Sequence, residues 1–488
     1  MSDHTVGLSA RRIGFLLGPM LGLVLYLFID PNFISPGAYK VIAVALWIIV
    51  WWITEAVPFP VTAMMPLVLF PLMGTMKMSE AAAPYANPII FLFMGGFMIA
   101  LALEKHRVHE RIALNLIRLT GTSGNGIILG FMIATGFISM WISNTATAMM
   151  MLPIALSVIN LIKKDQGQGV ESLSREERNF ALGLMLMVGY AATLGGLATI
   201  IGTPPNVVFV GLLEEFYGQK MQFGKWMIVG VPVALLTLLS TYLIVTRILF
   251  RNGIKKVEGS EELIKSKLAE LGGIRKEEKR VLGIFGLTSF LWILQQPINL
   301  ALGHDVLNDT NVAMAGGLLM FVVPADFKAG TFLLEWNDTR KMAWGILFLF
   351  GGGLCMADAL ENAGVIQSVG QWIASQTTFN AWLIFALIVA GVLLSELMSN
   401  VALVQVFVPV VFGIADNLGV NAILLAMPVT LSASIGFMFP IATPPNAIVF
   451  SSGYIRMKDM VRAGLLLDIA SVIIIFFSSI TLVKWVFG

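Results

Sequence analysis

The four residues TPPN occur twice in this chain, at residues 203–206 and again at residues 443–446. Each copy interrupts an apolar run, and two prolines break a helix because proline lacks a backbone N–H and crowds the preceding turn. The same letters suit a helix start, since the threonine is a capable N-cap and the first proline fits the first helical position. We therefore expect two broken helices, at residues 202–206 and 442–446.

The composition places these breaks in a membrane protein. Of the 488 residues, 57% are hydrophobic and 12% are charged, and the mean hydropathy is +0.85. Apolar stretches recur along the whole chain, and several reach the roughly 20 residues that a helix needs to cross a bilayer. The sequence predicts an all-α polytopic membrane protein with about 11 transmembrane helices plus two re-entrant hairpins.

Further landmarks repeat in the same order as TPPN. FLFMGG at residues 91–96 recurs as FLFGGG at residues 348–353, and SNTATAMMMLPI at residues 143–154 recurs as SNVALVQVFVPV at residues 399–410. The spacing to TPPN is shorter in the second copy because a polar loop at residues 163–178 has no counterpart there. Collinear landmarks of this kind indicate an internal repeat.

The distribution of Lys and Arg predicts that the two copies have opposite orientations. Basic residues cluster after both landmarks of the first copy, whereas residues 342–455 contain none. By the positive-inside rule, the first hairpin opens to the cytoplasm and the second opens to the outside. Inverted repeats are typical of secondary transporters, whose sites form at the bilayer midplane from broken helices. The halves span residues 13–246 and 281–488.

The same rule orients the remaining segments. Residues 1–12 form a cytoplasmic N-terminal tail, and the basic stretch 247–280 is a cytoplasmic linker that favours an interfacial helix over a partner-binding segment. Basic residues also precede the last span, so the C-terminus is expected outside. We expect the protein in the cell (inner or plasma) membrane.

The predicted breaks give four helix N-termini inside the membrane, at tips 143–145 and 399–401 and at the two TPPN copies. Each N-terminus exposes unpaired N–H groups with a partial positive charge, which suits an anion. Neither Lys nor Arg occurs at any tip, so negative charge has to be met by amides, hydroxyls and co-bound cations. Oxygens of Ser, Asn and Thr suit Na⁺; the alternative is polar glue between packed helices.

Other classes of function find little support. The net charge of +2 gives no basic surface for nucleic acid, and one cysteine allows no disulfide framework. His106 and His109 are interpreted as a polar helix end, because a metal site needs further ligands. An enzyme would need a nucleophile–base pair or a metal cluster, and the residues for both are sparse.

With these motifs the chain resembles the divalent anion–sodium symporter family over nearly its whole length. The sharpest element is the run A-S-x-x-F-x-x-P-I-A-x-x-x-N-x-I-V at residues 433–449, and both hairpin tips fit as well. The resemblance implies a homodimer whose protomers have a scaffold domain and a transport domain, each built from both halves. The transport domain would hold the hairpins and broken helices and move as an elevator.

The resemblance also assigns at least two Na⁺ sites and a substrate site. One Na⁺ would bind Ser139, Ser143, Asn144 and the Gly202 region, and a second would bind Ser395, Asn400 and the Ala442 region. Ser395 stands where a threonine is expected. The substrate carboxylates would meet a third set of residues, namely Asn144, Thr145, Thr203, Asn400, Val401, Thr443 and Pro444.

Two positions break the symmetry of the copies. Val401 replaces the hydroxyl that Thr145 supplies in the first tip, which leaves the preferred dicarboxylate open. Glu396 has no acidic counterpart in the first copy, and it could brace the hairpin, add charge near a cation or carry a proton.

The predicted function is Na⁺-coupled uptake of a C4-dicarboxylate such as succinate, fumarate or malate, with no enzymatic activity. Dicarboxylate exchange, sulfate or citrate transport on the same fold, and a passive anion channel are the alternatives.

Overall fold

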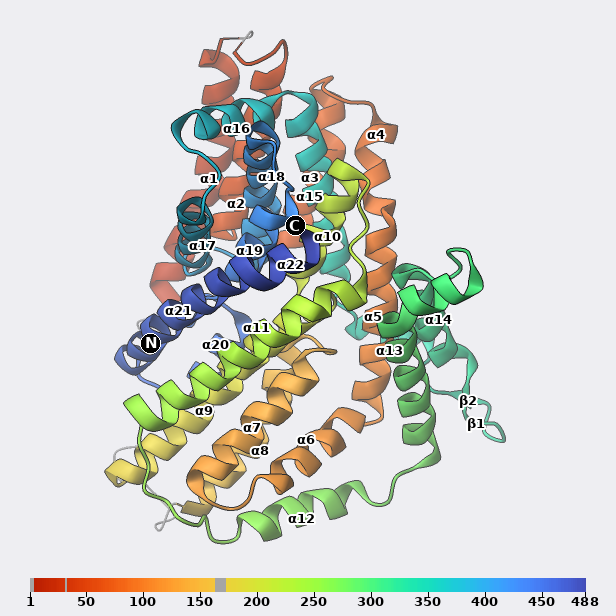
Figure 1. Ribbon diagram of the computed structural model, residues 1–488, viewed down its shortest axis with the longest axis vertical. Helices are drawn as coiled ribbons and strands as arrows, with labels where there is room; N and C mark the ends of the chain where they lie inside the picture. Colours follow the sequence, from red (N-terminus) through yellow and green to blue (C-terminus); the bar gives the residue numbers. More distant parts are fainter. Residues whose placement is uncertain (1–3, 31–32, 163–172) are drawn as a thin grey trace.

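The computed structural model describes residues 4–30, 33–162 and 173–488, so most of the polar loop at 163–178 lies outside the described residues. The described chain is almost entirely helical (Figure 1). The elements of the first half up to its hairpin are α1 (His4–Phe28), α2 (Ala38–Thr54), α3 (Phe59–Leu72), α4 (Met78–Ala82), η1 (Ala83–Ala86), α5 (Pro88–Lys105) and α6 (Val108–Leu119). Helix α1 thus extends into the stretch expected as a tail.

The remaining elements follow in the same manner. The first hairpin, its broken helix and the linker comprise α7 (Gly124–Ser139), α8 (Asn144–Ile162), α9 (Arg175–Gly195), η3 (Gly196–Ala198), α10 (Pro204–Tyr217), α11 (Phe223–Leu243), η4 (Ile244–Leu249) and α12 (Ser260–Leu271). The second half comprises α13 (Lys276–Leu302), α14 (Asp309–Val322), β1 (Pro324–Asp326), β2 (Thr331–Phe332), η5 (Trp336–Lys341), α15 (Trp344–Asn362), α16 (Val365–Gln376), α17 (Ala381–Ser395), α18 (Asn400–Leu418), α19 (Ile423–Ser432), α20 (Pro444–Phe450), α21 (Met457–Ser478), η6 (Ser479–Val483) and α22 (Lys484–Phe487).

Nine helical segments in the described part of the chain are long and apolar enough to cross a membrane. Six further apolar helices have 10–17 residues, and they include one arm of each hairpin, α7 and α17. A helix this short does not span about 30 Å of hydrocarbon by itself. Short arms are what a re-entrant hairpin requires.

Both hairpins have turns of the same length. Helix α7 ends at Ser139 and α8 begins at Asn144, while α17 ends at Ser395 and α18 begins at Asn400. The arms of each pair contact one another. Both expected breaks are also present, because α10 begins at Pro204 and α20 begins at Pro444.

The hairpins pack crosswise on the broken helices. Helix α8 of the first hairpin contacts α20 of the second half, and α18 of the second hairpin contacts α10 of the first half. Helix α9 contacts α7 and α8 of the first hairpin and α20 of the second half, and its most apolar stretch is completely buried inside the protein. The packing joins residues that lie more than 180 positions apart in the sequence.

A second group of helices packs through small residues. Helices α5 and α14 make an extensive contact, in which a Cβ on Gly95 would lie 2.5 Å from the carbonyl of Ala313. Glycine at such a contact lets helix backbones approach closely within a membrane. Helix α15 packs against α3 in the same part of the molecule.

Helix α12 marks one end of the molecule, and α4 and α16 lie near the other end (Figure 1). Helix α12 packs against α6 and α8. Its buried residues are Ser260 and Ile264, whereas most of its other side chains are charged or exposed. The basic linker therefore contains an amphipathic helix, as expected of an interfacial segment.

Candidate functional site

The turn of the first hairpin gathers oxygen atoms around the Asn144 side chain. Ser139 Oγ lies 2.7 Å from Asn144 Oδ1, and the Ser139 hydroxyl also donates to the carbonyl of Ala192 at 2.5 Å. With its amide rotated by 180°, Asn144 donates to Ser139 Oγ, to Ala192 O at 3.0 Å and to Gly202 O at 3.2 Å. The amide position is thus surrounded by three oxygens. These oxygens can accept hydrogen bonds from the Asn144 amide N–H groups. When Asn144 Oδ1 is turned toward them instead, the same oxygens can surround a small cation.

Glycine is required where the broken segment passes the hairpin turn. A Cβ on Gly196 would lie 2.7 Å from Asn144 Oδ1 and 3.1 Å from Gly202 O. The hydroxyl of Thr199 donates to Met140 O at 2.5 Å and accepts from Gly202 N at 3.0 Å. Thr199 therefore holds the hairpin turn against the break in the helix.

The second hairpin repeats this arrangement with less contact. Ser395 Oγ donates to Asn400 Oδ1 at 3.1 Å, across the same five-residue separation as in the first tip. A Cβ on Gly436 would lie 2.9 Å from Ser395 Oγ and 3.2 Å from the Cβ of Ala442. The structure thus brings Ser395, Asn400 and Ala442 together, as it does Ser139, Asn144 and Gly202.

The asparagine of TPPN makes matching hydrogen bonds in both copies. Asn206 Nδ2 donates to Gly196 O at 3.1 Å and to Thr199 O at 2.8 Å. Asn446 Nδ2 donates to Gly436 O at 2.9 Å and to the carbonyl of Phe439 at 3.2 Å. Both side chains are buried. The sequence reading assigned these asparagines no role, although their place in a repeated motif was a usable signal.

The threonines of TPPN occupy the N-cap positions, but the prediction that they cap the helices is wrong. Neither Thr203 nor Thr443 makes a side-chain capping bond, and both have extended backbones. Prolines at the first two helical positions remove two N–H groups, including the one at the second position that an N-cap side chain commonly binds. The buried hydroxyl of Thr443 has no hydrogen-bond partner among the described residues. At the hairpins, Ser143 caps α8 by accepting from Ala146 N at 3.3 Å, whereas Ser399 makes no such bond.

The predicted substrate residues differ in accessibility. Asn144, Thr145, Asn400 and Val401 are half-buried at their tips, and Thr203 and Thr443 are buried. Pro444 is exposed at the start of α20.

Glu396 braces the second hairpin from within the protein. Its Oε1 accepts from Phe437 N at 2.6 Å and Met438 N at 2.8 Å, and its Oε2 accepts from Phe439 N at 3.3 Å. These residues belong to the segment between α19 and α20, so the carboxylate ties the hairpin turn to the second break. The hydrogen-bonding role considered for Glu396 is therefore present.

A cavity of about 600 Å³ adjoins the first hairpin tip. Ile142 and Ala146, which flank the tip, form part of its wall. Basic and acidic side chains form another part, among them Lys105 and Asp338, whose ion pair measures 2.7 Å. Burial raises the pKa of Asp338, but the hydrogen bonds from Lys105 and from the Glu335 N–H, together with the charges of Lys105 and Lys341, outweigh it and lower that pKa below its usual range.

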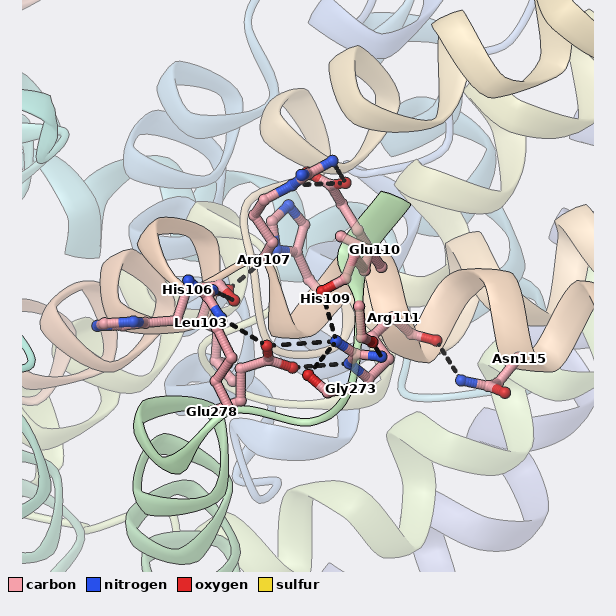
Figure 2. Close-up of polar contacts among 12 residues, drawn as sticks. Leu103, His106, Arg107, His109, Glu110, Arg111, Asn115, Gly273 and Glu278 are labelled. Carbon is pink, nitrogen blue, oxygen red and sulfur yellow. Dashed lines mark hydrogen bonds and ion pairs between the residues drawn. The ribbon is translucent and has the colours of Figure 1, made fainter. Parts of the chain in front are cut away.

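The charged side of this cavity is held by the corner between α5 and α6. Figure 2 shows Glu278 between Arg111 and the loop that precedes α13. Arg111 Nε lies 2.7 Å from Glu278 Oε2, and Arg275 Nε lies 3.0 Å from Oε1. The two histidines contact backbone carbonyls, with His106 Nε2 2.9 Å from Leu333 O and His109 Nδ1 3.0 Å from Leu103 O. These contacts give both histidines a structural role at a helix end.

Three comparisons with known proteins agree with this architecture. The family model described as the sodium:sulfate symporter transmembrane region matches residues 12–488. The chain is 38% identical over 474 residues to the sodium-dependent dicarboxylate transporter SdcS of Staphylococcus saprophyticus, covering 95% of this chain and 90% of the relative. It is also 38% identical over 472 residues to SdcS of Staphylococcus aureus, covering 96% and 90%.

A solved structure with a similar fold is the Alcanivorax borkumensis YdaH transporter, described as having an unusual topology. The TM-score is 0.57 over 84% of this chain and 87% of that chain, and the sequences are 12% identical, so the likeness concerns the fold. The family match covers almost the whole sequence and agrees with the motifs at both hairpins and breaks. The chain therefore belongs to the divalent anion–sodium symporter family, whose transmembrane region the matching model describes.

Proposed function

We propose that this chain is a secondary active transporter that couples Na⁺ entry to uptake of a C4-dicarboxylate such as succinate, fumarate or malate. The observation that carries the proposal is the pair of oxygen-rich hairpin tips without a basic side chain. No Lys, Arg or His occurs in residues 139–145, 196–206, 395–401 or 436–446. A doubly negative substrate at such a site needs cations bound beside it. The staphylococcal relatives are named as sodium-dependent dicarboxylate transporters.

The first Na⁺ would bind at the turn of the first hairpin. Ser139 Oγ, Asn144 Oδ1 and the carbonyl of Gly202 supply neutral oxygens there, and Ser143 lies in the same turn. Hard cations prefer oxygen ligands of this kind. The rotated Asn144 amide donates to the oxygens of Ser139 and Gly202; a bound Na⁺ would take the place of those N–H groups, with Asn144 Oδ1 turned toward it.

The second Na⁺ would bind at the second hairpin, with Ser395, Asn400 and the backbone near Ala442. The matching contacts of Asn206 and Asn446 support treating the two sites as copies of one design. In keeping with the distribution of basic residues, we propose that the copies are inverted with respect to the membrane.

The substrate would lie between the tips. Asn144, Thr145 and Thr203 would meet one carboxylate, and the residues of the second copy would meet the other. Thr443 carries a buried hydroxyl without a partner among the described residues, which makes it available to a ligand. Val401 offers only apolar contact, so the second carboxylate would rely on Asn400, Thr443 and the helix start at Pro444.

We propose that the crosswise packed body moves against the remaining helices as an elevator. The body consists of both hairpins and both broken helices, which contact one another through α8 with α20 and through α10 with α18. The cavity beside the first tip would serve as its cytoplasmic exit. A partly filled site carries net charge, and the cost of moving that charge through low dielectric would keep the body in place.

The test is transport by purified protein in proteoliposomes. Radiolabelled succinate should accumulate in empty vesicles under an inward Na⁺ gradient and should not accumulate when choline replaces Na⁺. Unlabelled malate or fumarate should compete more strongly than sulfate or citrate. Uptake that needs an internal dicarboxylate and ignores Na⁺ would show an exchanger and overturn the proposal.

A further inference from the structure

Two buried carboxylates lie beside one another in the second half of the chain. Glu396 follows Ser395 in the hairpin turn, and Asp468 lies in the middle of α21. The residues are 2% and 4% exposed. A Cβ on Gly464, one helical turn before Asp468, would lie 2.4 Å from Met438 N, the same N–H that donates to Glu396, so α21 packs directly on the segment that Glu396 holds. Two negative charges close together in a low-dielectric interior repel strongly. Something positive is needed to hold them there.

The charge of Glu396 is already compensated. Three backbone N–H groups, from residues 437–439, donate to its two oxygens at 2.6 to 3.3 Å. These bonds satisfy both oxygens of Glu396. Of the two carboxylates, Asp468 is therefore the one that still needs a positive group beside it.

Asp468 has no such compensation. Neither of its oxygens has a hydrogen-bond partner among the described residues. The Phe437 N–H donates to Glu396, and the Tyr190 hydroxyl donates to the carbonyl of Phe437 at 3.0 Å, so neither serves Asp468. A buried ionised carboxylate without a partner is strongly unfavourable.

In the described part of the chain, no basic side chain donates to either oxygen of Asp468. Residues 342–455 contain neither Lys nor Arg, and on α21 the basic residues Lys458 and Arg462 are exposed near its start. Among the described residues, no third Asp, Glu, His or Cys joins the pair to form a larger metal-binding group. One uncompensated negative charge with oxygen ligands fits one monovalent cation.

We propose that Asp468 and Glu396 bind a Na⁺ ion, at a site separate from those at the two hairpin turns. Asp468 would supply the charge, and Glu396 would contribute Oε2, whose only hydrogen bond, 3.3 Å from Phe439 N, is the longest of the three. The ion would join α21 to the hairpin turn and to the second break. Asp468 and Glu396 would bind this ion whether or not the chain transports dicarboxylates.

The experiment measures Na⁺ binding to purified protein in nanodiscs, without any transport. The variant Asn144→Ala/Asn400→Ala removes side chains from both hairpin sites, and its melting temperature and equilibrium ²²Na⁺ binding are measured against NaCl at pH 8, with choline chloride keeping ionic strength constant. We expect a saturable rise in melting temperature and about one bound Na⁺ per chain to remain. Adding Asp468→Asn should abolish both signals.

Asp459→Asn is the matched control, because Asp459 lies on the same helix but pairs with Arg178 at 3.3 Å. It should leave Na⁺ binding unchanged. Residual Na⁺ binding that survives Asp468→Asn would overturn the proposal. Absence of residual Na⁺ binding in the double variant would also overturn it, and this result does not depend on whether the Asp468 variant folds. A residual stabilisation that appears on lowering the pH, with no ²²Na⁺ bound, would assign the pair to a shared proton instead.

Discussion

Ser139 Oγ and Asn144 Oδ1 lie 2.7 Å apart across the turn of the first hairpin, and the same two residue types lie 3.1 Å apart across the second. The pair joins the last residue of one arm to the first residue of the other. Each pair therefore both closes its hairpin and directs two oxygens toward the neighbouring broken helix.

Removing either asparagine should abolish Na⁺-coupled uptake. Asn144→Ala and Asn400→Ala each delete an oxygen assigned to both a Na⁺ and the substrate, so we expect transport to fall to background while the protein still inserts into the membrane. Succinate uptake into proteoliposomes measures this. Asn417→Ala is the control, because Asn417 bonds to Gly413 O in its own helix, outside the tips. Normal transport by either tip variant would refute the site assignment.

Gly196→Ala should weaken Na⁺ binding at the first tip. The added methyl would press on Asn144 Oδ1 and on the carbonyl of Gly202, two of the proposed ligands. We expect the apparent affinity for Na⁺ to fall about tenfold or more, which corresponds to ~1.4 kcal/mol. Gly286→Ala places a methyl in open space in α13 and should leave the Na⁺ dependence of uptake unchanged. Equal Na⁺ dependence in both variants would contradict the proposed ligand set.

Val401→Thr tests the asymmetry of the substrate site. The change adds the hydroxyl that Thr145 supplies in the first tip, and an added hydrogen bond to a charged carboxylate contributes about 1.5–3 kcal/mol in favourable geometry. We expect the KM for succinate to decrease and the ranking of succinate against malate to change. Val406→Thr, on the same helix beyond the tip, should change neither. An unaltered KM would show that the second carboxylate does not reach residue 401.

The buried ion pair at the corner of α6 predicts a large effect on stability. The Glu278 side chain is 3% exposed and pairs with two arginines, Arg111 and Arg275. Arg111→Ala removes one of these partners and leaves the buried carboxylate with less compensation. We therefore expect a loss of about 3 kcal/mol in the free energy of unfolding. Thermal unfolding in detergent gives the comparison. Lys265→Ala breaks an exposed pair with Glu261 and should change stability little. Comparable losses in the two variants would show that Arg111 is not structural.

His109 predicts how stability depends on pH. Burial lowers the pKa of this imidazole, against the opposing effect of its bond to Leu103 O. The unfolded chain therefore takes up a proton near pH 6.5, where the folded chain does not, and the free energy of unfolding falls as the pH drops below about 6.5. The melting temperature of His109→Gln should fall less between pH 7.5 and 5.5 than that of the unaltered chain. An equal fall would assign the acid sensitivity to other groups.

The sequence by itself determined the membrane class, the order of the repeated landmarks and the positions of both breaks. Apolar length, the order of the landmarks and the double prolines are local properties, and proline ends a helix wherever it is placed. For the same reason α10 and α20 begin at Pro204 and Pro444, as the sequence predicted.

Only the tertiary structure decided which groups meet. Thr203 and Thr443 occupy the N-cap positions that local preference predicts, but neither makes a side-chain capping bond, and the two prolines that follow each threonine offer it no N–H. Asn206 and Asn446 bond to carbonyls seven and ten residues before them, across a break whose path the packing sets. The three N–H groups on Glu396 and the packing of α21 beside them depend on contacts between segments tens of residues apart. Burial and facing oxygens arise from such packing, and no pattern along a single segment encodes them.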